Sequence, residues 1–311
     1  MCGIVGYSGP KETLPILIDG LSRLEYRGYD SAGIAISDGN KITVEKKEGK
    51  LDILKNHLKD SNIKGNIGIG HTRWATHGVP NDVNAHPHSD NSEEFAIIHN
   101  GIIENYAEIK KDLLEEGFEF KSDTDTEVVA VELSRKWNGE LLRTVTEVAK
   151  TLEGTYALVV TTTKEEGTIV AGRLMSPLVL GVGENEVFLA SDSAAILEHT
   201  NKMIFLENGD FVEIKNGQYK LFDSDLNEIK REIQEIDWEV SEAEKLGHDH
   251  FMYKEILEQA EVIERTISGR LETTSKEIPI KQDEASKYEK IWIVACGTAY
   301  HAGLFGKDLF E

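Results

Sequence analysis

Residues 154–224 form a run of short apolar segments that are separated by turn residues. Each segment has the length and β-branched content of a strand: TYALVVTTT, GTIVAG, PLVLGVG, EVFLAS, MIFLENGD, FVEIKNG and QYKLFDS. They lack the regular alternation with helices that a doubly wound parallel sheet requires. The run therefore predicts antiparallel sheets, and no other feature of the sequence restricts the fold so strongly.

The residues before this run alternate strand-like and helix-like blocks. Strands are expected at residues 2–8, 32–37, 43–49, 66–73 and 94–99, and the second and third form a hairpin about an Asp-Gly-Asn turn. Helices are expected at residues 11–24, 51–59, 105–117, 124–137 and 140–152. Thr124 and Glu127 have the spacing of a capping box at the start of the fourth helix. We therefore predict an α+β fold in which two antiparallel sheets are covered by helices.

The composition is that of a folded protein with an acidic surface. Of the 311 residues, 40% are hydrophobic and 29% are charged, and the net charge is −22. Such an excess of acid repels phosphate backbones, so no nucleic-acid partner is expected. No apolar run approaches the ~18 residues of a membrane span, and no basic region precedes the first apolar stretch as it would in a signal peptide. Cys2 and Cys296 stand in different motifs, which excludes a disulfide framework, and the cytoplasm is the expected compartment.

Cys2 is the first candidate for chemistry. If Met1 is removed, the thiol and a free α-amine belong to one residue, and the small side chain after Met1 suits that removal. An α-amine titrates near pH ~8, so at neutral pH a fraction of it is a base that can take the thiol proton and later protonate departing ammonia. Glycines in MCGIVG allow the backbone to approach a small substrate closely. A buried structural cysteine is the alternative.

Three candidate binding residues stand in HTRWATHG, which follows a predicted strand. Arg73 offers the two-pronged donor that suits an α-carboxylate, and Thr76 and His77 offer hydrogen bonds at a fixed spacing from it. Asp125, in the first turn of a predicted helix, is a candidate partner for a substrate ammonium. An acid at that position also suits the helix dipole without any ligand.

Asn100 and Gly101 stand in HNGIIEN, which we expect to end a strand and to lead into a helix. A side-chain amide and a backbone N–H are the donors that a tetrahedral oxyanion needs. An ordinary Asn-Gly turn would contain the same two residues.

Five histidines lie between residues 71 and 99 and raise the question of a metal site: His71, His77, His86, His88 and His99. No pair of them has the i, i+4 spacing of ligands on a helix, and the region reads as loop and strand. We therefore predict neither a metal site nor a cofactor.

The residues after 238 read differently from those before. A polar stretch with one long helix at residues 249–267 is expected to be a linker and a docking helix. Residues 290–311 (KIWIVACGTAYHAGLFGKDLFE) read as a buried strand, a turn and a helix, and Gly297 and Thr298 stand where backbone N–H groups and a hydroxyl suit a phosphate. A single βα unit cannot form a parallel sheet, so we expect the chain to stop inside a second domain.

Taken together, these segments resemble the glutamine–fructose-6-phosphate aminotransferase (isomerizing) family. The resemblance extends over nearly the whole chain and rests on MCGIVGY, RLEYRGYDSAG, HTRWATHG, NAHPH, HNGIIEN, TDTE, SPLVLG, ASD and CGTAYHAG. It implies a glutaminase domain at residues 1–238 with the N-terminal-nucleophile fold, a four-layer αββα sandwich. It also implies a linker and docking helix at residues 239–285, and the first strand and helix of a sugar isomerase domain at residues 286–311.

The resemblance also implies a role for each matched residue. Cys2 is the nucleophile and its freed amine is the base, while Asn100 and Gly101 form the oxyanion hole. The other matched residues bind substrates: Arg73 (the glutamine carboxylate, with Thr76 and His77 nearby), Asp125 (its ammonium), Arg27 (in the loop that closes over glutamine), Trp74 (the gate of the ammonia channel) and Thr298 (the sugar phosphate). Ala299 follows Thr298 where the family often has serine, so one phosphate hydroxyl is missing.

The family reaction takes ammonia from glutamine and passes it through an internal channel to the isomerase domain. That domain converts fructose 6-phosphate to glucosamine 6-phosphate for amino-sugar biosynthesis, and the full-length protein is expected to be a homodimer. A chain that ends at Glu311 is expected to do no more than hydrolyse glutamine, weakly or without regulation.

Two alternatives remain open at this point. One is another amidotransferase with an N-terminal cysteine, of the phosphoribosyl or asparagine synthetase type. Such an enzyme needs a phosphoribosyl-binding or an ATP-pyrophosphate motif downstream, and CGTAYHAG is neither. The other is a binding module without catalysis, which would be favoured if Met1 were retained.

Overall fold

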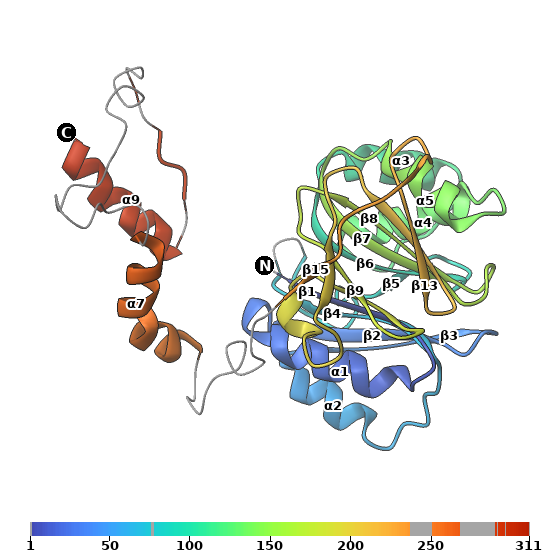
Figure 1. The fold of residues 1–311 in the computed structure, drawn as a ribbon. Coiled ribbons are helices and arrows are strands. Elements are labelled where there is room, and N and C mark those ends of the chain that lie inside the picture. Colours follow the sequence, from blue (N-terminus) through green and yellow to red (C-terminus); the bar gives the residue numbers. More distant parts are fainter. Residues whose placement is uncertain are drawn as a thin grey trace. The chain divides into compact units, whose positions relative to one another are not determined.

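Two antiparallel β-sheets lie face to face in the first part of the chain, and helices cover the outer side of each sheet (Figure 1). The structure is a computed structural model that describes residues 2–75, 78–236, 251–267, 290, 292–295 and 297–310. The chain divides into two compact units, Met1–Leu246 and Gly247–Glu311, and both sheets belong to the first unit.

The first sheet has eight strands and contains the start of the chain. In spatial order they are β15 (Gln234–Glu235), β11 (Lys202–Phe205), β9 (Val179–Val182), β10 (Val187–Ala190), β1 (Gly3–Ser8), β4 (Ile67–Arg73), β2 (Ser31–Ser37) and β3 (Ile42–Glu48). All neighbouring pairs are antiparallel, and the predicted hairpin of β2 and β3 is confirmed. Because β1 lies between β10 and β4, all six of its residues are buried, and the residue that precedes it stands in the middle of the sheet.

The second sheet has seven strands, again with antiparallel neighbours. In spatial order they are β14 (Glu228–Ile229), β13 (Gln218–Phe222), β12 (Phe211–Lys215), β8 (Thr168–Leu174), β7 (Gly154–Thr162), β6 (Phe95–Ile103) and β5 (His88–Ser89). The prediction that a strand ends before Asn100 is wrong. Pairing with β7 continues until Ile103 stands opposite Gly154, so Asn100 and Gly101 lie inside β6.

Three apolar layers hold these elements together. Between the sheets, residues such as Ile4, Ile69, Ile98 and Val159 form one buried cluster. The outer face of the first sheet packs on α1 (Thr13–Leu24) and α2 (Leu51–Leu58), and that of the second on α3 (Tyr106–Glu115), α4 (Asp125–Arg135) and α5 (Leu141–Ala149). The layers are thus helix, sheet, sheet and helix, and the predicted α+β, four-layer αββα sandwich is confirmed.

At the start of α4 only one of the two hydrogen bonds of the predicted capping box is present. Thr124 Oγ1 accepts a hydrogen bond from the Glu127 backbone N–H at 3.4 Å, as an N-cap residue does. The Glu127 carboxylate, however, does not return to Thr124. It accepts from the backbone N–H groups of Lys121 (2.8 Å) and Ser122 (2.6 Å), and so fixes the segment that leads into the helix.

The described residues of the second unit include two helices, α7 (Phe251–Ile267) and α9 (Gly297–Phe310). The predicted long helix and the helix after the Gly-Thr turn are therefore confirmed, while most of the predicted linker lies outside the described residues. The buried strand expected before α9 is wrong: residues 292–295 are not in a strand, and Trp292 and Val294 are exposed (77% and 95%). A strand needs a neighbour for its backbone hydrogen bonds, and the described part of this unit offers none.

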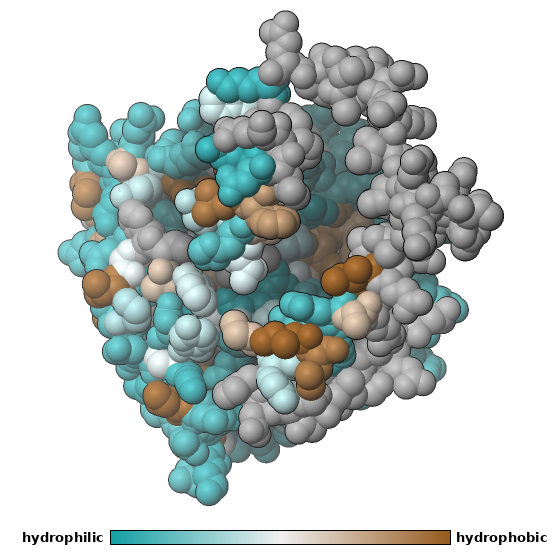
Figure 2. All heavy atoms as spheres, turned by 90° about the vertical axis from the view of Figure 1, so that its left-hand side faces the viewer, coloured by the Kyte–Doolittle hydropathy of each residue, from teal (hydrophilic) through white to brown (hydrophobic). Residues whose placement is uncertain are grey.

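One face of the described residues is mostly hydrophilic. Hydrophilic residues predominate on the face drawn in Figure 2, and hydrophobic residues stand there in small groups. Among the helices that the structure describes, none combines the length and the apolar character that crossing a bilayer requires.

A cavity in the apolar layer between the sheets should lower the stability of the protein. Ile169 of β8 is fully buried in that layer, so Ile169→Ala should lower the free energy of unfolding by about 2–5 kcal/mol in urea titrations. Ile53→Ala is the matched control, because Ile53 on α2 is 50% exposed, and it should cost about 1 kcal/mol or less. Equal losses for the two variants would contradict the assignment of this layer as the main core.

Candidate active site

Cys2 lies immediately before β1, which is an inner strand of the first sheet. The Trp74 backbone N–H donates to its Sγ at 3.2 Å, and Sγ lies 3.6 Å from the Trp74 carbonyl oxygen. Burial raises the pKa of the Cys2 thiol, and the Trp74 N–H group and the nearby Arg73 guanidinium act in the opposite direction. A thiol with a raised pKa is mostly protonated at neutral pH, so it needs a base beside it to become a nucleophile.

Asn100 connects the second sheet to this cysteine. Its side chain reaches across from β6, and Nδ2 donates to the Cys2 carbonyl oxygen at 3.0 Å. Its Oδ1 lies 3.0 Å from His71 Nε2 on β4. Only 8% of Asn100 is exposed, so its amide is held within hydrogen-bonding distance of the Cys2 backbone by fixed partners.

Gly101 follows in a backbone conformation that other residues rarely adopt. Its φ is +135°, and a Cβ atom there would lie 2.0 Å from the Thr155 carbonyl oxygen of β7. Both the dihedral angle and the contact exclude a side chain, so this position requires glycine.

Arg73 carries a positive charge near Cys2, and Asp125 carries a negative charge near Arg73. Arg73 is the last residue of β4 and is only 4% exposed, and its Nη2 donates to the Gly78 carbonyl oxygen at 3.4 Å. Burial lowers the pKa of Arg73. The nearby Cys2 thiol and Asp125 carboxylate act to raise it, because a negative charge on either stabilises the charged guanidinium. Asp125 is the first residue of α4, and the Ile103 N–H donates to its Oδ2 at 2.9 Å. A cation near a thiol and an anion near that cation match the two charges of an amino acid's α-carbon groups.

The backbone of Arg73 and Trp74 rests on Gly28 and Asp30, two residues that the site prediction did not include. A Cβ atom on Gly28 would lie 2.7 Å from the Arg73 carbonyl carbon and 2.8 Å from the Trp74 nitrogen. Asp30 then holds the segment at both ends, since its N–H donates to the Arg73 carbonyl (3.0 Å) and its Oδ2 accepts from the Ala75 N–H (2.8 Å). Both residues stand in RLEYRGYDSAG, but nothing in that motif alone shows which backbone it touches.

The remaining predicted residues differ in where they lie. Arg27 is buried and donates from Nη1 to the Ser191 carbonyl (3.2 Å) and to Asp192 (3.0 Å), beyond the end of β10. The Trp74 ring is 44% exposed and stands edge-on to Tyr29. Thr76 and His77 lie outside the described residues. Thr298 is in α9 of the second unit, so the structure does not relate it to Cys2.

Four of the five histidines form a buried cluster beneath the site: His71, His86, His88 and His99. The rings of His71 and His86 stack at 4.3 Å, and His86 Nε2 and His99 Nδ1 both meet the Thr126 hydroxyl, at 2.9 and 3.0 Å. Burial lowers the pKa of every one of the four, that of His71 to about 3. One ring nitrogen of each of these histidines meets a hydroxyl or carbonyl oxygen, whereas Nδ1 of His71 and of His86 has no hydrogen-bond partner in the described part of the chain. Among the described residues no three potential metal ligands converge.

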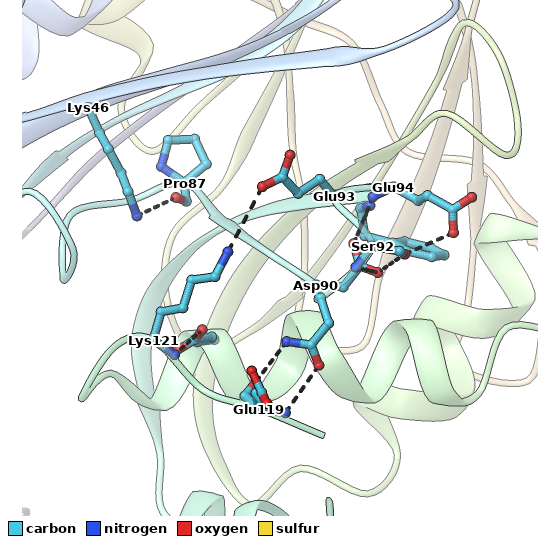
Figure 3. Close-up of polar contacts among 11 residues, drawn as sticks. Lys46, Pro87, Asp90, Ser92, Glu93, Glu94, Glu119 and Lys121 are labelled. Carbon is cyan, nitrogen blue, oxygen red and sulfur yellow. Dashed lines mark hydrogen bonds and ion pairs between the residues drawn. The ribbon is translucent and has the colours of Figure 1, made fainter. Parts of the chain in front are cut away.

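A lysine holds the loop that carries two of these histidines. The Lys46 ammonium on β3 donates to the carbonyl oxygens of Val83, Ala85 and Pro87 at 3.0, 2.8 and 3.2 Å. Figure 3 shows Lys46 reaching the Pro87 carbonyl, with Lys121 directed toward a neighbouring acid. The ammonium group has three N–H donors, and each donates to one of the three carbonyls. These hydrogen bonds hold residues 83–87 against β3 of the first sheet.

A family model described as a glutamine amidotransferase domain matches residues 56–248. The chain belongs to the glutamine amidotransferase family. Curated relatives agree with this: the amidotransferase is 49% identical to glutamine–fructose-6-phosphate aminotransferase [isomerizing] from Clostridium perfringens, over 100% of this chain and 52% of that protein. It is also 49% identical to the protein of the same name from Fusobacterium nucleatum, over 99% of this chain and 51% of that protein. The chain spans about half the length of the curated relatives it matches.

Solved structures support the same fold. The glutamine phosphoribosylpyrophosphate amidotransferase of B. subtilis, complexed with ADP and GMP, matches with a TM-score of 0.64 and 28% identity, over 73% of this amidotransferase and 50% of that chain. A glutamine aminotransferase class-II domain protein from Silicibacter pomeroyi matches over 71% of this chain and 99% of its own, with a TM-score of 0.51 and 14% identity. At that identity the second match shows the fold alone, and it agrees with the predicted N-terminal-nucleophile type.

The contact at Gly28 makes a prediction about the amidotransferase site. Gly28→Ala should displace the Arg73–Trp74 backbone and with it the N–H donor to Cys2 Sγ, since a backbone atom cannot rotate away as a side chain can. We expect kcat for glutamate release to fall about tenfold to a hundredfold. Gly306→Ala is the control: Gly306 lies on α9, a Cβ atom there would stand 3.8 Å from its nearest neighbour, the Ile293 side chain, and activity should not change. Wild-type activity in Gly28→Ala would show that this contact does not position Trp74.

The buried histidines predict a loss of stability in mild acid. An unfolded histidine titrates near pH 6.5, whereas burial lowers the pKa of His71 to about 3 in the folded protein. At pH 5 the unfolded chain therefore binds a proton that the folded amidotransferase does not, and stability falls as the pH falls below 6.5. His71 alone should contribute a loss of about 2 kcal/mol between pH 7.5 and pH 5.0, as measured by urea unfolding at each pH. Equal stability at the two values would show that the cluster is protonated in the fold.

Proposed function

We propose that this chain hydrolyses the side-chain amide of glutamine to glutamate and ammonia, with Cys2 as the nucleophile. The observation that carries the proposal is the position of two donors: the Asn100 Nδ2 group 3.0 Å from the Cys2 carbonyl, and the Trp74 N–H 3.2 Å from Sγ. A half-buried thiol with amide N–H donors close to it is what acyl transfer from a carboxamide requires.

The proposed reaction begins when removal of Met1 frees the α-amine of Cys2. This amine accepts the thiol proton, and Sγ forms a bond to the amide carbon of glutamine. The negative charge that develops on the amide oxygen is stabilised by Asn100 Nδ2 and the Gly101 backbone N–H. The α-ammonium then donates its proton to the leaving nitrogen, ammonia departs, and water hydrolyses the γ-glutamyl thioester to glutamate and free thiol.

Glutamine recognition is assigned to the two buried charges and their neighbours. The Arg73 guanidinium would bind the α-carboxylate, with Thr76 and His77 beside it, and Asp125 would bind the α-ammonium. Support comes from the burial of both charged groups, 4% and 9% exposed, since an ion pair with substrate gains strength where water is excluded.

The activity named for the relatives extends the proposal to a whole protein. That protein would transfer the ammonia to fructose 6-phosphate and form glucosamine 6-phosphate, with Arg27 in the loop that closes over glutamine, Trp74 as the gate and Thr298 at the sugar phosphate. The expected division is a glutaminase domain at residues 1–238, a linker and docking helix at 239–285, and the start of an isomerase domain at 286–311. The homodimer and the cytoplasmic location expected from the sequence stay predictions.

The phosphoribosyl-type amidotransferase is the weaker candidate. The B. subtilis enzyme of that name is 28% identical, against 46–49% for relatives named as fructose-6-phosphate aminotransferases, and those matches continue through residues 290–311. A module that binds glutamine without reacting would require that Met1 be retained, and intact mass spectrometry distinguishes this case directly.

The nucleophile can be tested by one substitution. Cys2→Ala should lower glutamate release more than about a thousandfold, because no other described group can form the thioester. Coupled glutamate dehydrogenase assays would measure the rate, and circular dichroism spectra should be unchanged. Glutamate release that survives in Cys2→Ala would place the nucleophile elsewhere. A mass that includes Met1, together with no release by the wild type, would overturn the enzymatic proposal.

A further inference from the structure

The Asn100 carboxamide is held at both ends by neighbouring strands of the opposite sheet. Asn100 belongs to β6 of the second sheet, while its two partners belong to the first: Nδ2 meets the Cys2 carbonyl just before β1, and Oδ1 meets His71 Nε2 on β4, each at 3.0 Å. Residues of β1 and β4 are directly paired, with Ile4 opposite His71. The amide is therefore clamped between the nucleophile's own backbone and one imidazole.

Two backbone carbonyls determine where the hydrogens lie in the hydrogen bonds that join His71, Asn100 and Cys2. His71 Nε2 is also 3.2 Å from the His99 carbonyl oxygen, which can only accept, so Nε2 carries the hydrogen. The atom of Asn100 that faces Nε2 must then be the oxygen, and the nitrogen must face Cys2. The Cys2 carbonyl, also only an acceptor, requires the same orientation.

The surroundings keep His71 in this single state. The ring is 0% exposed, and burial lowers its pKa to about 3, so it is neutral over the working range and carries one ring hydrogen. One face of the His71 ring is stacked on the ring of His86, and a hydrogen bond of 2.9 Å to Thr126 fixes the His86 ring. The ring therefore has a fixed place as well as a fixed tautomer.

We propose that His71 is a positioning residue that orients the Asn100 amide, so that Nδ2 rather than Oδ1 faces the developing oxyanion. The proposal rests on the glutaminase function proposed above. If the carboxamide were rotated by half a turn, its oxygen would face both the Cys2 carbonyl and the oxyanion, and its N–H groups would face the Nε2–H of His71. The imidazole thus excludes the orientation in which Asn100 Oδ1 would face the oxyanion and repel its negative charge.

His71→Gln and His71→Met form a matched pair for testing this role. The two side chains have nearly the same length, but only glutamine can donate to both the His99 carbonyl and Asn100 Oδ1. We expect His71→Met to lower kcat for glutamate release about a hundredfold with KM for glutamine changed less than about threefold, and His71→Gln to recover at least a tenth of wild-type kcat. Alkylation of Cys2 by iodoacetamide should proceed at the same rate in both, because that reaction develops no oxyanion.

Two further comparisons separate positioning from damage to the fold. In an Asn100→Ala background, adding His71→Met should lower kcat no further, since no amide remains to be oriented. His88→Met is the control for burial: its imidazole is equally buried in the cluster but bonds to the Thr124 hydroxyl at 3.0 Å, and kcat should stay within about threefold of wild type. Equal kcat in the Gln and Met variants, or an equal loss in His88→Met, overturns the proposal.

The outcomes also distinguish this inference from the proposed function. If the wild type releases no more glutamate than Cys2→Ala, the glutaminase function fails and this inference fails with it. If the wild type is active and His71→Met is as active, only the inference fails. Should His71→Met not fold, nitrogen NMR of wild-type protein labelled at histidine decides: a His71 ring protonated at Nδ1 instead of Nε2 overturns the proposal.

Discussion

The burial of one face of each sheet against the other is the interaction on which the rest of the molecule depends. Residues of both sheets share a single apolar cluster, and the helices only cover the two outer faces. Because the sheets are held at a fixed separation, a side chain from one can reach the backbone of the other, as Asn100 reaches Cys2. The candidate site is therefore formed by residues of both sheets, and no single strand or loop contains all of them.

Much of the fold could be predicted from the sequence, because strands and helices are local patterns. The hairpin, the helices and the antiparallel sheets follow from periodicity and turn residues. The errors arose where a long-range partner decides the outcome. β6 continues past Asn100 because β7 pairs with it through Gly154, and residues 292–295 are not a strand because no neighbour among the described residues pairs with them.

The candidate site was predictable in part for the same reason. Cys2, Arg73, Asn100 and Asp125 carry chemistry that can be recognised in each motif separately, and the structure brings them together. Gly28, Asp30 and His71 were missed as supporting residues because each acts through contacts with distant backbone or side chains. His71 was noticed only as one of several histidines, and its spacing from the others says nothing about the amide that it meets.

The central place of β1 has a consequence for how the protein is made. Its two neighbours are β4 and β10, which begin at Ile67 and Val187. A ribosome adds about 5–20 residues per second, so the strand that follows Cys2 waits on the order of 10–40 s for its second neighbour to be synthesised. During synthesis Cys2 is thus made long before both neighbours of the strand that follows it are available. Such delayed pairing is slow by the standards of small domains, and it leaves an apolar strand in need of protection while translation proceeds.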